Sequence, residues 1–466
     1  MRRHWLPSLR SLLPLHRVST LSLSSTSQLM DRSIPEPPPL KRRRSYEENV
    51  VTPELSSDQS SRPGQWAEPN STQSNVSWSC VGGASTPGPQ VKVLHRAWES
   101  CCRADVCPPG VSRGRGRRWD FSVLSYNILS QQLLEENLYL YRHAPPHVLR
   151  WELRLHNLIR EITQLHADIV CLQEVQHDHY ESHIKAALHT LGYHCEYKKR
   201  TGSKPDGCVV AFRTCRFSLV SSNPVEFFRP GDALLDRDNV GLVVLLRPLG
   251  TDWSLCVANT HLLYNPRRGD VKLAQLAVLL AEVARMSRLP DGSATPVLLC
   301  GDFNSTPWSP LYHFLTNGRL DCRGLTIGAV SGQEFPSRGH RLLSVPLWSH
   351  TLGINQQCQY EGEDSSRPAV VVNNRAVISH TLRLWSSYKH RLNPDGRSEV
   401  TTCHSHTAIT VDYILYTPAV LGGRGLQLLG KLSLVGEREL EEVNGLPNQH
   451  HPSDHLPLLA TFRLHH

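Results

Sequence analysis

The chain has 466 residues, enough for two or three average domains or for one large domain with disordered ends. It carries 50 Lys and Arg against 42 Asp and Glu, and this net charge of +8 suits a phosphate-rich partner without requiring one. Thirteen scattered Cys, an odd number, argue against a disulfide framework, and no apolar run approaches the roughly 20 residues that span a bilayer, so we expect a reducing compartment and no membrane segment.

The first 115 residues are predicted to be disordered, because Ser, Pro, Gly and Gln dominate residues 50–115 and cannot bury enough apolar surface. Residues 1–30 contain four Arg and no acid, a composition typical of a mitochondrial transit peptide but equally of a basic tail. The basic run 41–44 is a weak signal for nuclear import or nucleic-acid binding. The sequence therefore predicts the cytoplasm, the nucleus or both, with the mitochondrion as an alternative. Any protein partner is unknown and is expected to bind this region.

From about residue 116 to residue 466 the pattern is that of one α/β domain. Apolar periodicity predicts helices over residues 148–166 and 270–289. The segment 320–400 is long and polar and is interpreted as an insertion, with a mobile loop over 355–378. Buried strands are predicted over residues 121–129, 168–175, 207–213, 239–248, 253–263, 296–304, 410–417 and 456–464.

Polar residues able to bind metal or phosphate stand at the ends of many of these strands. One such residue is most often a turn or cap residue, but a sheet places its strand ends side by side. Carboxylates and carboxamides are ligands that Mg²⁺ or Mn²⁺ prefers, and imidazoles contact phosphate or transfer protons. No Ser or Cys nucleophile motif and no Walker loop is present. Metal-assisted attack of water on a phosphate ester is therefore predicted. The residues are Asn127, Glu174, Asp206, Asn259, His261, Asp302, Asn304, Asp412, Asp454 and His455.

The motifs YNIL, LQEV, DGC, NTHL, GDFNSTP, DYI and SDHLP, in this order, resemble the exonuclease–endonuclease–phosphatase superfamily over residues 120–466. The segments HLLYNPRRGDVKLAQL (261–276) and LWSSYKHRL (384–392) resemble its branch of Angel proteins, relatives of nocturin and of the carbon-catabolite-repression-type deadenylases. The resemblance implies a four-layer α/β sandwich, in which two mixed sheets face each other and helices cover the outside.

The resemblance also implies residue roles. Glu174, Asn127 and Asp454 are the expected metal residues, and the expected cofactor is Mg²⁺ or Mn²⁺. Asp302 deprotonates the attacking water, and Asn304 holds that water or a phosphate oxygen. The remaining catalytic and substrate-side residues are His455 with Asp412 to orient it, His261 as a second phosphate contact, and Asp206 and Asn259 with less defined roles.

The implied substrate is the 3′ end of RNA. We expect hydrolysis of a terminal 2′,3′-cyclic phosphate to hydroxyls, with stepwise 3′→5′ exonuclease or poly(A) deadenylase activity as the alternative. Tyr264, Phe303 and Trp308 are candidates to line the entrance, ordinary packing being the alternative. The basic segment Lys198, Lys199, Arg200 and Lys204 is predicted to hold RNA phosphates, the alternative being a solvated loop.

Two further interpretations stay open at this point. An inositol-phosphate or apurinic-site enzyme would use the same fold. A protein of another class, an mRNA-binding adaptor in translation or decay, would act through the N-terminal region and would keep its function without the metal.

Overall fold

The computed structural model describes residues 92–101, 118–334, 341–361, 375–392, 396–405, 407–419 and 423–465, all within one compact unit, residues 84–466. The transit-like segment 1–30, the basic run 41–44 and most of the region predicted to be disordered lie outside the described residues.

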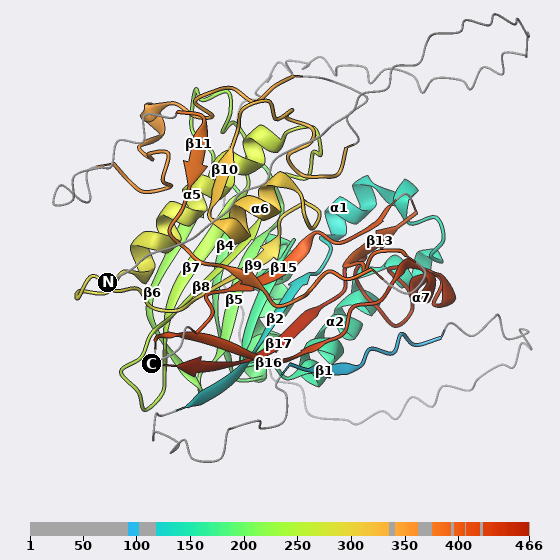
Figure 1. Ribbon diagram of the computed structural model, residues 1–466. Coiled ribbons are helices and arrows are strands. Elements are labelled where there is room, and N and C mark those ends of the chain that lie inside the picture. Colours follow the sequence, from blue (N-terminus) through green and yellow to red (C-terminus); the bar gives the residue numbers. More distant parts are fainter. Residues whose placement is uncertain are drawn as a thin grey trace, which may run out of the picture. The chain divides into compact units, whose positions relative to one another are not determined.

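Two mixed sheets stack face to face, as the sequence predicts, and helices cover their outer faces (Figure 1). The first sheet has the order β1 (Trp98–Ser100), β16 (Gly425–Leu432), β17 (Leu458–His465), β2 (Trp119–Asn127), β3 (Ile169–Gln173), β5 (Gly207–Arg213) and β4 (Tyr193–Lys199). The second has the order β12 (Trp385–Ser386), β15 (Asp412–Tyr416), β9 (Val297–Asp302), β8 (Leu255–His261), β7 (Val240–Pro248) and β6 (Phe217–Glu226). Each sheet contains one parallel pair, β2 with β3 and β8 with β9, and its other neighbours are antiparallel.

The helices form the two outer layers. Side chains of α2 (Trp151–Leu165) and of the continuous run α3 (His177–His179), η3 (Tyr180–Ile184) and α4 (Lys185–Thr190) share a core with the first sheet. Helices α5 (Gly269–Ser287) and α6 (Pro310–Asn317) share one with the second sheet. The smaller elements are α1 (Gln131–Glu136), η1 (Leu138–Leu140), η2 (Pro146–Leu149), η4 (His350–Leu352), α7 (Glu437–Glu442), the pair β10 (Arg319–Asp321) with β11 (Val377–Ser379), and the pair β13 (Thr402–His404) with β14 (Thr407–Ile409).

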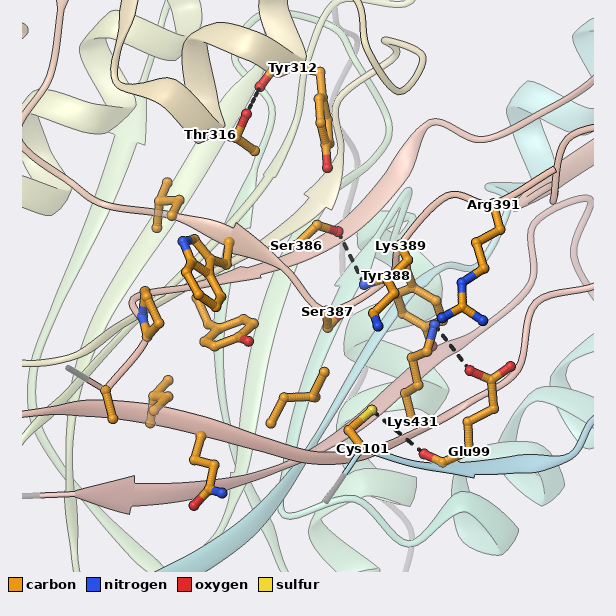
Figure 2. Close-up of a pocket in the computed structure, with 18 of the residues that line it drawn as sticks. Glu99, Cys101, Tyr312, Thr316, Ser386, Ser387, Tyr388, Lys389, Arg391 and Lys431 are labelled. Atoms are coloured by element: carbon orange, nitrogen blue, oxygen red, sulfur yellow. Dashed lines mark hydrogen bonds and ion pairs between the residues drawn. The ribbon is translucent and has the colours of Figure 1, made fainter. Parts of the chain in front are cut away.

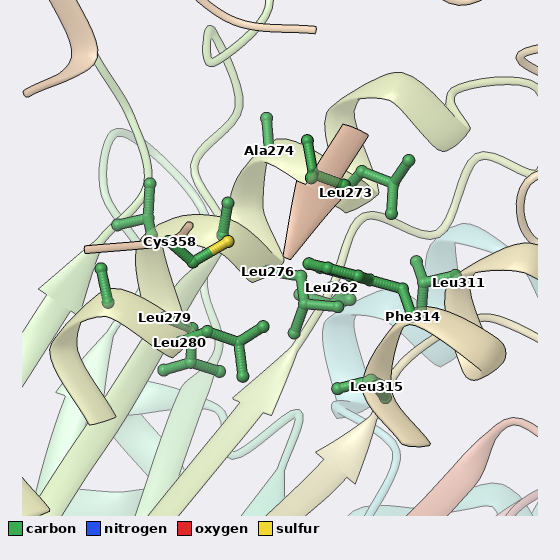
Figure 3. Close-up of a cluster of buried hydrophobic side chains, with 14 of the residues drawn as sticks. Leu262, Leu273, Ala274, Leu276, Leu279, Leu280, Leu311, Phe314, Leu315 and Cys358 are labelled. Atoms are coloured by element: carbon green, nitrogen blue, oxygen red, sulfur yellow. The ribbon is translucent and has the colours of Figure 1, made fainter. Parts of the chain in front are cut away.

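The α5 layer explains why the stretch LAQLAVLLAEVA is so apolar. This helix is buried along almost its whole length, between the second sheet and the segment around Cys358. Figure 3 shows Leu276 and Leu279 of α5 beside Leu262, with Phe314 of α6 next to them. None of the helices in the described residues is long and apolar enough to cross a membrane.

The predicted buried strands and both long helices are confirmed, and the observed ends differ by a few residues. The strands that the sequence did not predict include β4 and β6, which form edges of the two sheets. Their side chains are half exposed, and β6 contains Pro224, so neither has the apolar run of an interior strand.

Two predicted loose segments are ordered instead. Residues 98–100, assigned to the disordered region, form β1 and pair antiparallel with β16, so that assignment is wrong for them. In the segment predicted to be a mobile loop, Cys358 is buried and Tyr360 packs against the same core as α5. Residues 362–374 of that loop lie outside the described residues. The described cysteines other than Cys101 form no disulfide bond.

Candidate active site

The predicted site residues meet at one end of the sandwich. The parallel strands β2, β3, β8 and β9 end there, while β15 begins there and β17 begins nearby. The register places Asp302 opposite His261 on one side and opposite Asp412 on the other. The polar residues collect at this edge because parallel neighbours expose their carboxyl ends together.

Asp302 stands at the centre of the site. Its Oδ2 lies 3.2 Å from Asn127 Nδ2, 3.5 Å from His261 Nε2 and 3.8 Å from His455 Nε2. Its Oδ1 accepts the backbone N–H of Asn304 at 2.8 Å. Burial, followed by the charge of Asp412, raises the pKa of Asp302 to about 7. A carboxylate with a pKa near neutrality is suited to accept a proton from water.

His455 is held as a cation by Asp412. Its Nδ1 lies 2.8 Å from Asp412 Oδ2, and that oxygen also accepts the Thr401 hydroxyl at 2.6 Å. Burial works against the imidazolium, but Asp412, then Asp454 and Asp302, outweigh it and raise the pKa of His455 well above its usual range. Its other ring nitrogen, Nε2, faces Asp302 and the centre of the site. The predicted pair is therefore present, and Thr401 is an additional positioning residue that no sequence motif indicated.

Glu174 lies beside this pair in a left-handed backbone conformation, with φ of +56°. Its Oε1 accepts Asn127 Nδ2 at 3.1 Å, and its Oε2 accepts the Ser130 N–H at 3.1 Å. Burial raises its pKa, to which the neighbouring Asp206 and Asp454 contribute. Mutually repelling buried carboxylates of this kind fit a site for a divalent cation.

The donor set can be tested against a metal ion. Asp302, Asp412 and His455 each offer an atom within 4.8 Å of the others. However, His455 as an imidazolium has no lone pair for a metal, and Asp412 Oδ2 already binds it. Glu174 and Asp302, on either side of the Asn127 amide, fit better.

The two other predicted metal residues stand differently. The Asn127 nitrogen faces both carboxylates while its oxygen accepts the Leu129 N–H at 3.1 Å, so in this arrangement Asn127 spaces the carboxylates and does not present the predicted oxygen ligand. Asp454 accepts the Tyr141 hydroxyl on Oδ2 at 2.9 Å, and its Oδ1 is buried without a hydrogen-bond partner in the described residues. That free oxygen fits a metal-bound water or the ion itself.

Asn304 and His261 face each other, and a lysine supports them from behind. Asn304 Nδ2 lies 3.0 Å from His261 Nε2 and donates to the carbonyl of Leu262 at 3.1 Å. Asn304 is left-handed, with φ of +46°. The fully buried Lys272 donates from Nζ to the Asn304 carbonyl at 2.5 Å and to Gln333 Oε1 at 2.8 Å.

Burial lowers the pKa of Lys272 to about 7. Sequence reasoning did not identify this residue, although a lone Lys within the apolar pattern of 270–289 was a visible signal. Burial also lowers the pKa of His261, although Glu174 and Asp206 act in the opposite direction. Its imidazole is therefore suited to act as a neutral hydrogen-bond donor to phosphate.

Asn259 does not contact the open site, contrary to the prediction. Its Nδ2 donates to the carbonyls of Leu172 and Val209 at 2.8 Å each, and its Oδ1 accepts Gln173 Nε2 at 2.8 Å. It is fully buried and ties the two sheets together. The physical reason is depth, because it precedes His261 by two residues and so lies one pleat further inside the sandwich.

The predicted entrance residues stand in different surroundings. Tyr264 is 65% exposed, and its pKa is raised by partial burial and by Tyr139, Asp454 and Asp302, which places it toward the site. Phe303 is buried in the core beside Tyr413, so its predicted place at the entrance is wrong. Trp308 is exposed in the turn that leads into α6.

The basic segment lies at the edge strand β4 and in the loop after it. Lys198 forms an ion pair with Glu226, and Arg200 Nη1 donates to the buried Asp206 at 3.2 Å. Lys199 Nζ makes a 3.5 Å contact with the Arg200 carbonyl, and Lys204 is exposed. Two of the four cations are therefore already paired with carboxylates.

Comparison with known proteins agrees with this architecture. The model of the endonuclease/exonuclease/phosphatase family matches residues 124–455. Protein angel homolog 2 of Danio rerio is 55% identical over 479 residues, covering 96% of this chain and 82% of that protein. Protein angel homolog 1 of Homo sapiens is 41% identical, covering 80% and 67%. A crystal structure of ANGEL2, described as a 2′,3′-cyclic phosphatase, in complex with adenosine-2′,3′-vanadate is 53% identical, covers 80% of this chain and 99% of that chain, and superposes with a TM-score of 0.71.

Proposed function

The chain belongs to the endonuclease/exonuclease/phosphatase family, and we propose that it hydrolyses terminal 2′,3′-cyclic phosphates at RNA 3′ ends. Two water molecules are consumed, the two ester bonds to the ribose are cleaved in turn, and the products are 2′,3′-hydroxyls and inorganic phosphate. The observation that carries the proposal is the relative at 53% identity that is called a 2′,3′-cyclic phosphatase and binds adenosine-2′,3′-vanadate.

The side chains at the strand ends supply the proton transfer and the charge that this reaction needs. Asp302 accepts the proton of the attacking water, since its raised pKa lies close to neutral pH. His455, kept charged by Asp412, stabilises the negative charge that develops on the phosphate oxygens. His261 donates from Nδ1 to a second phosphate oxygen, and Asn304, whose Nδ2 lies 3.0 Å from His261 Nε2, positions the ring.

A divalent cation would be held by Glu174 and the carboxylates around it, and we propose Mg²⁺ or Mn²⁺ because oxygen donors dominate the cluster. When bound, the ion would place a positive charge against the phosphate and polarise its oxygens. The same carboxylates explain why the site needs a cation, because their mutual repulsion is relieved by it.

We propose that the terminal nucleotide of the RNA lies against Tyr264, whose exposed ring stands toward the site. A ring at this position suits stacking on the terminal base. Lys198 and Arg200 contribute less than the sequence suggested, because each already pairs with a carboxylate.

The test is product analysis with two RNAs of the same sequence, one ending in a 2′,3′-cyclic phosphate and one in an oligo(A) hydroxyl tail. Loss of the terminal phosphate at unchanged length is expected, and it should require a divalent cation and disappear with chelator. Asp302→Ala should be inactive, while Lys185→Glu on α4, on the outer face of the first sheet, should match the wild type. A ladder of shortened products would instead assign the protein to the exonucleases.

A further inference from the structure

A second concave surface lies at the open edge of the sandwich, outside the site described above. This edge groove is about 1590 Å³ and lies between β1 and β16 of the first sheet, β12 with the residues after it, and α6 (Figure 2). β1 and β12 are the end strands of their sheets, so the groove follows the line where the two sheets part. None of the catalytic side chains lines it.

Two exposed indoles line the groove. Trp308 and Trp385 are each 61% exposed, which is unusual for so large an apolar side chain. Trp308 is also left-handed, with φ of +66°, a conformation that bulky residues rarely adopt. Strained backbone and exposed aromatic surface at one residue are the combination found at ligand-binding positions.

The groove is positively charged. Its lining contains Lys389, Arg391 and Lys431 against a single carboxylate, Glu99. Lys431 Nζ forms an ion pair with Glu99 at 3.4 Å and lies 4.4 Å from the ring centroid of Tyr388. Neither Lys389 nor Arg391 has a salt bridge in the described residues, and Figure 2 shows both on the same side of the groove as Lys431. Cations of this kind beside exposed indoles suit a chain of phosphates and bases.

The groove adjoins the catalytic strand ends through α6. Trp308 stands in the turn that joins Asn304 to this helix, and Tyr312 of α6, also in the groove, packs against Tyr413 at 5.4 Å between ring centroids. Tyr413 follows Asp412 directly along β15. Because Trp308 is exposed and lies in the turn that follows Asn304, the proposed path of an extended polymer from the active site to the groove runs over Trp308.

We propose that the edge groove binds the body of a single-stranded RNA, 5′ to the nucleotide that carries the cyclic phosphate. Bases stack on Trp308 and Trp385, and phosphates pair with Lys389 and Arg391. The inference rests on the proposed function, because it assigns the groove to the substrate of the same site. It makes the enzyme prefer long single-stranded 3′ ends over mononucleotides.

The test compares substrates of different length. Adenosine 2′,3′-cyclic monophosphate and a series of oligoribonucleotides ending in the cyclic phosphate are hydrolysed by the wild type, by Trp385→Ala, and by the double variant Lys389→Glu with Arg391→Glu. We expect kcat/KM on the mononucleotide to be unchanged, and kcat/KM on the longest RNA to fall on the order of tenfold for each variant. The slope of log RNA affinity against log salt concentration should become less negative by about 0.7 for each phosphate that the double variant no longer neutralises.

Controls separate the groove from the fold and from the proposed function. Trp385→Phe keeps an aromatic face and should retain most of the long-RNA activity. The double variant Arg160→Glu with Lys185→Glu, on the outer helices α2 and α4, is the charge-matched control. Equal losses on the mononucleotide and the long RNA, or no loss on either, would overturn the proposal, and the latter would leave the groove to a protein ligand. If the wild type hydrolyses no cyclic phosphate, the proposed function fails, while fluorescence anisotropy of labelled RNA on the same variants still tests the groove.

Discussion

Replacing Asp412 by Asn should lower activity in a way that depends on pH. At 2.8 Å, the carboxylate and the imidazolium of His455 attract each other by roughly 6 kcal/mol at an effective dielectric constant of 20, an upper bound before desolvation. Losing that attraction lowers the pKa of His455, because Asp412 is the largest of the charges that raise it. Burial then weighs more heavily against the imidazolium, so a smaller fraction of His455 is charged in the variant than in the wild type at the same pH.

The assay is a pH–rate profile with a short cyclic-phosphate substrate. The ratio of variant to wild-type kcat/KM should fall on the order of 100-fold at pH 7.5 and recover as the pH drops, because acid restores the charge on His455. Removing the charge of Asp412 also lowers the pKa of Asp302, so the variant keeps this base deprotonated to lower pH and the recovery goes in the same direction. Thr401→Val removes the 2.6 Å hydrogen bond to Asp412 and leaves the carboxylate in place. This variant should lose less activity, and the ratio of its kcat/KM to the wild-type value should not change with pH. A deficit that is identical at every pH would refute the reasoning.

Three further predictions follow from other parts of the site. Lys272→Met preserves the volume of the side chain but removes the hydrogen bond to the Asn304 carbonyl. It should reduce kcat on the order of tenfold with little change in KM, because Asn304 is no longer held in position. An unchanged kcat in steady-state kinetics would exclude a positioning role for Lys272. Metal affinity should weaken by up to about tenfold per pH unit as the pH falls below 7, because Asp302, with its pKa of about 7, must lose a proton for the cluster to bind a cation. Titration calorimetry at pH 6 and pH 8 measures this change, and equal affinities at the two pH values would contradict it. Gly301→Ala should fail to accumulate as folded protein, because the added Cβ would lie 2.0 Å from the Thr260 carbonyl oxygen and Gly301 has a φ of +144°. Expression and thermal unfolding measure this effect, and a wild-type melting temperature would show that β8 and β9 move apart easily at this position.

Local chemistry predicted most of the site. Apolar runs ending in Asn127, Glu174 and Asp302 marked strands whose polar residues had to lie at a sheet edge, and their oxygen donors indicated a metal. The burial of Phe303 could also have been predicted from the alternation of side chains along a strand. Phe303 follows Asp302 directly, so the two side chains must point to opposite faces of the sheet.

The depth of a residue in the sandwich could not be predicted in this way. Asn259 and His261 have the same local pattern and face the same side of β8, yet only His261 reaches the open site. The difference depends on where the facing sheet ends, since the carbonyls of Leu172 and Val209 cover Asn259 from the other layer. No pattern within one strand contains that information.

The sequence by itself determined the alternation of buried strands and helices, the kind of chemistry, and the residues able to perform it, because these depend on side-chain type and on short-range periodicity. The tertiary structure decided the burial of Asn259 against Leu172 and Val209, the support of Asn304 by Lys272, and the edge groove. Each of these depends on segments far apart in the chain, and their meeting is fixed by strand order and by the stacking of the two sheets.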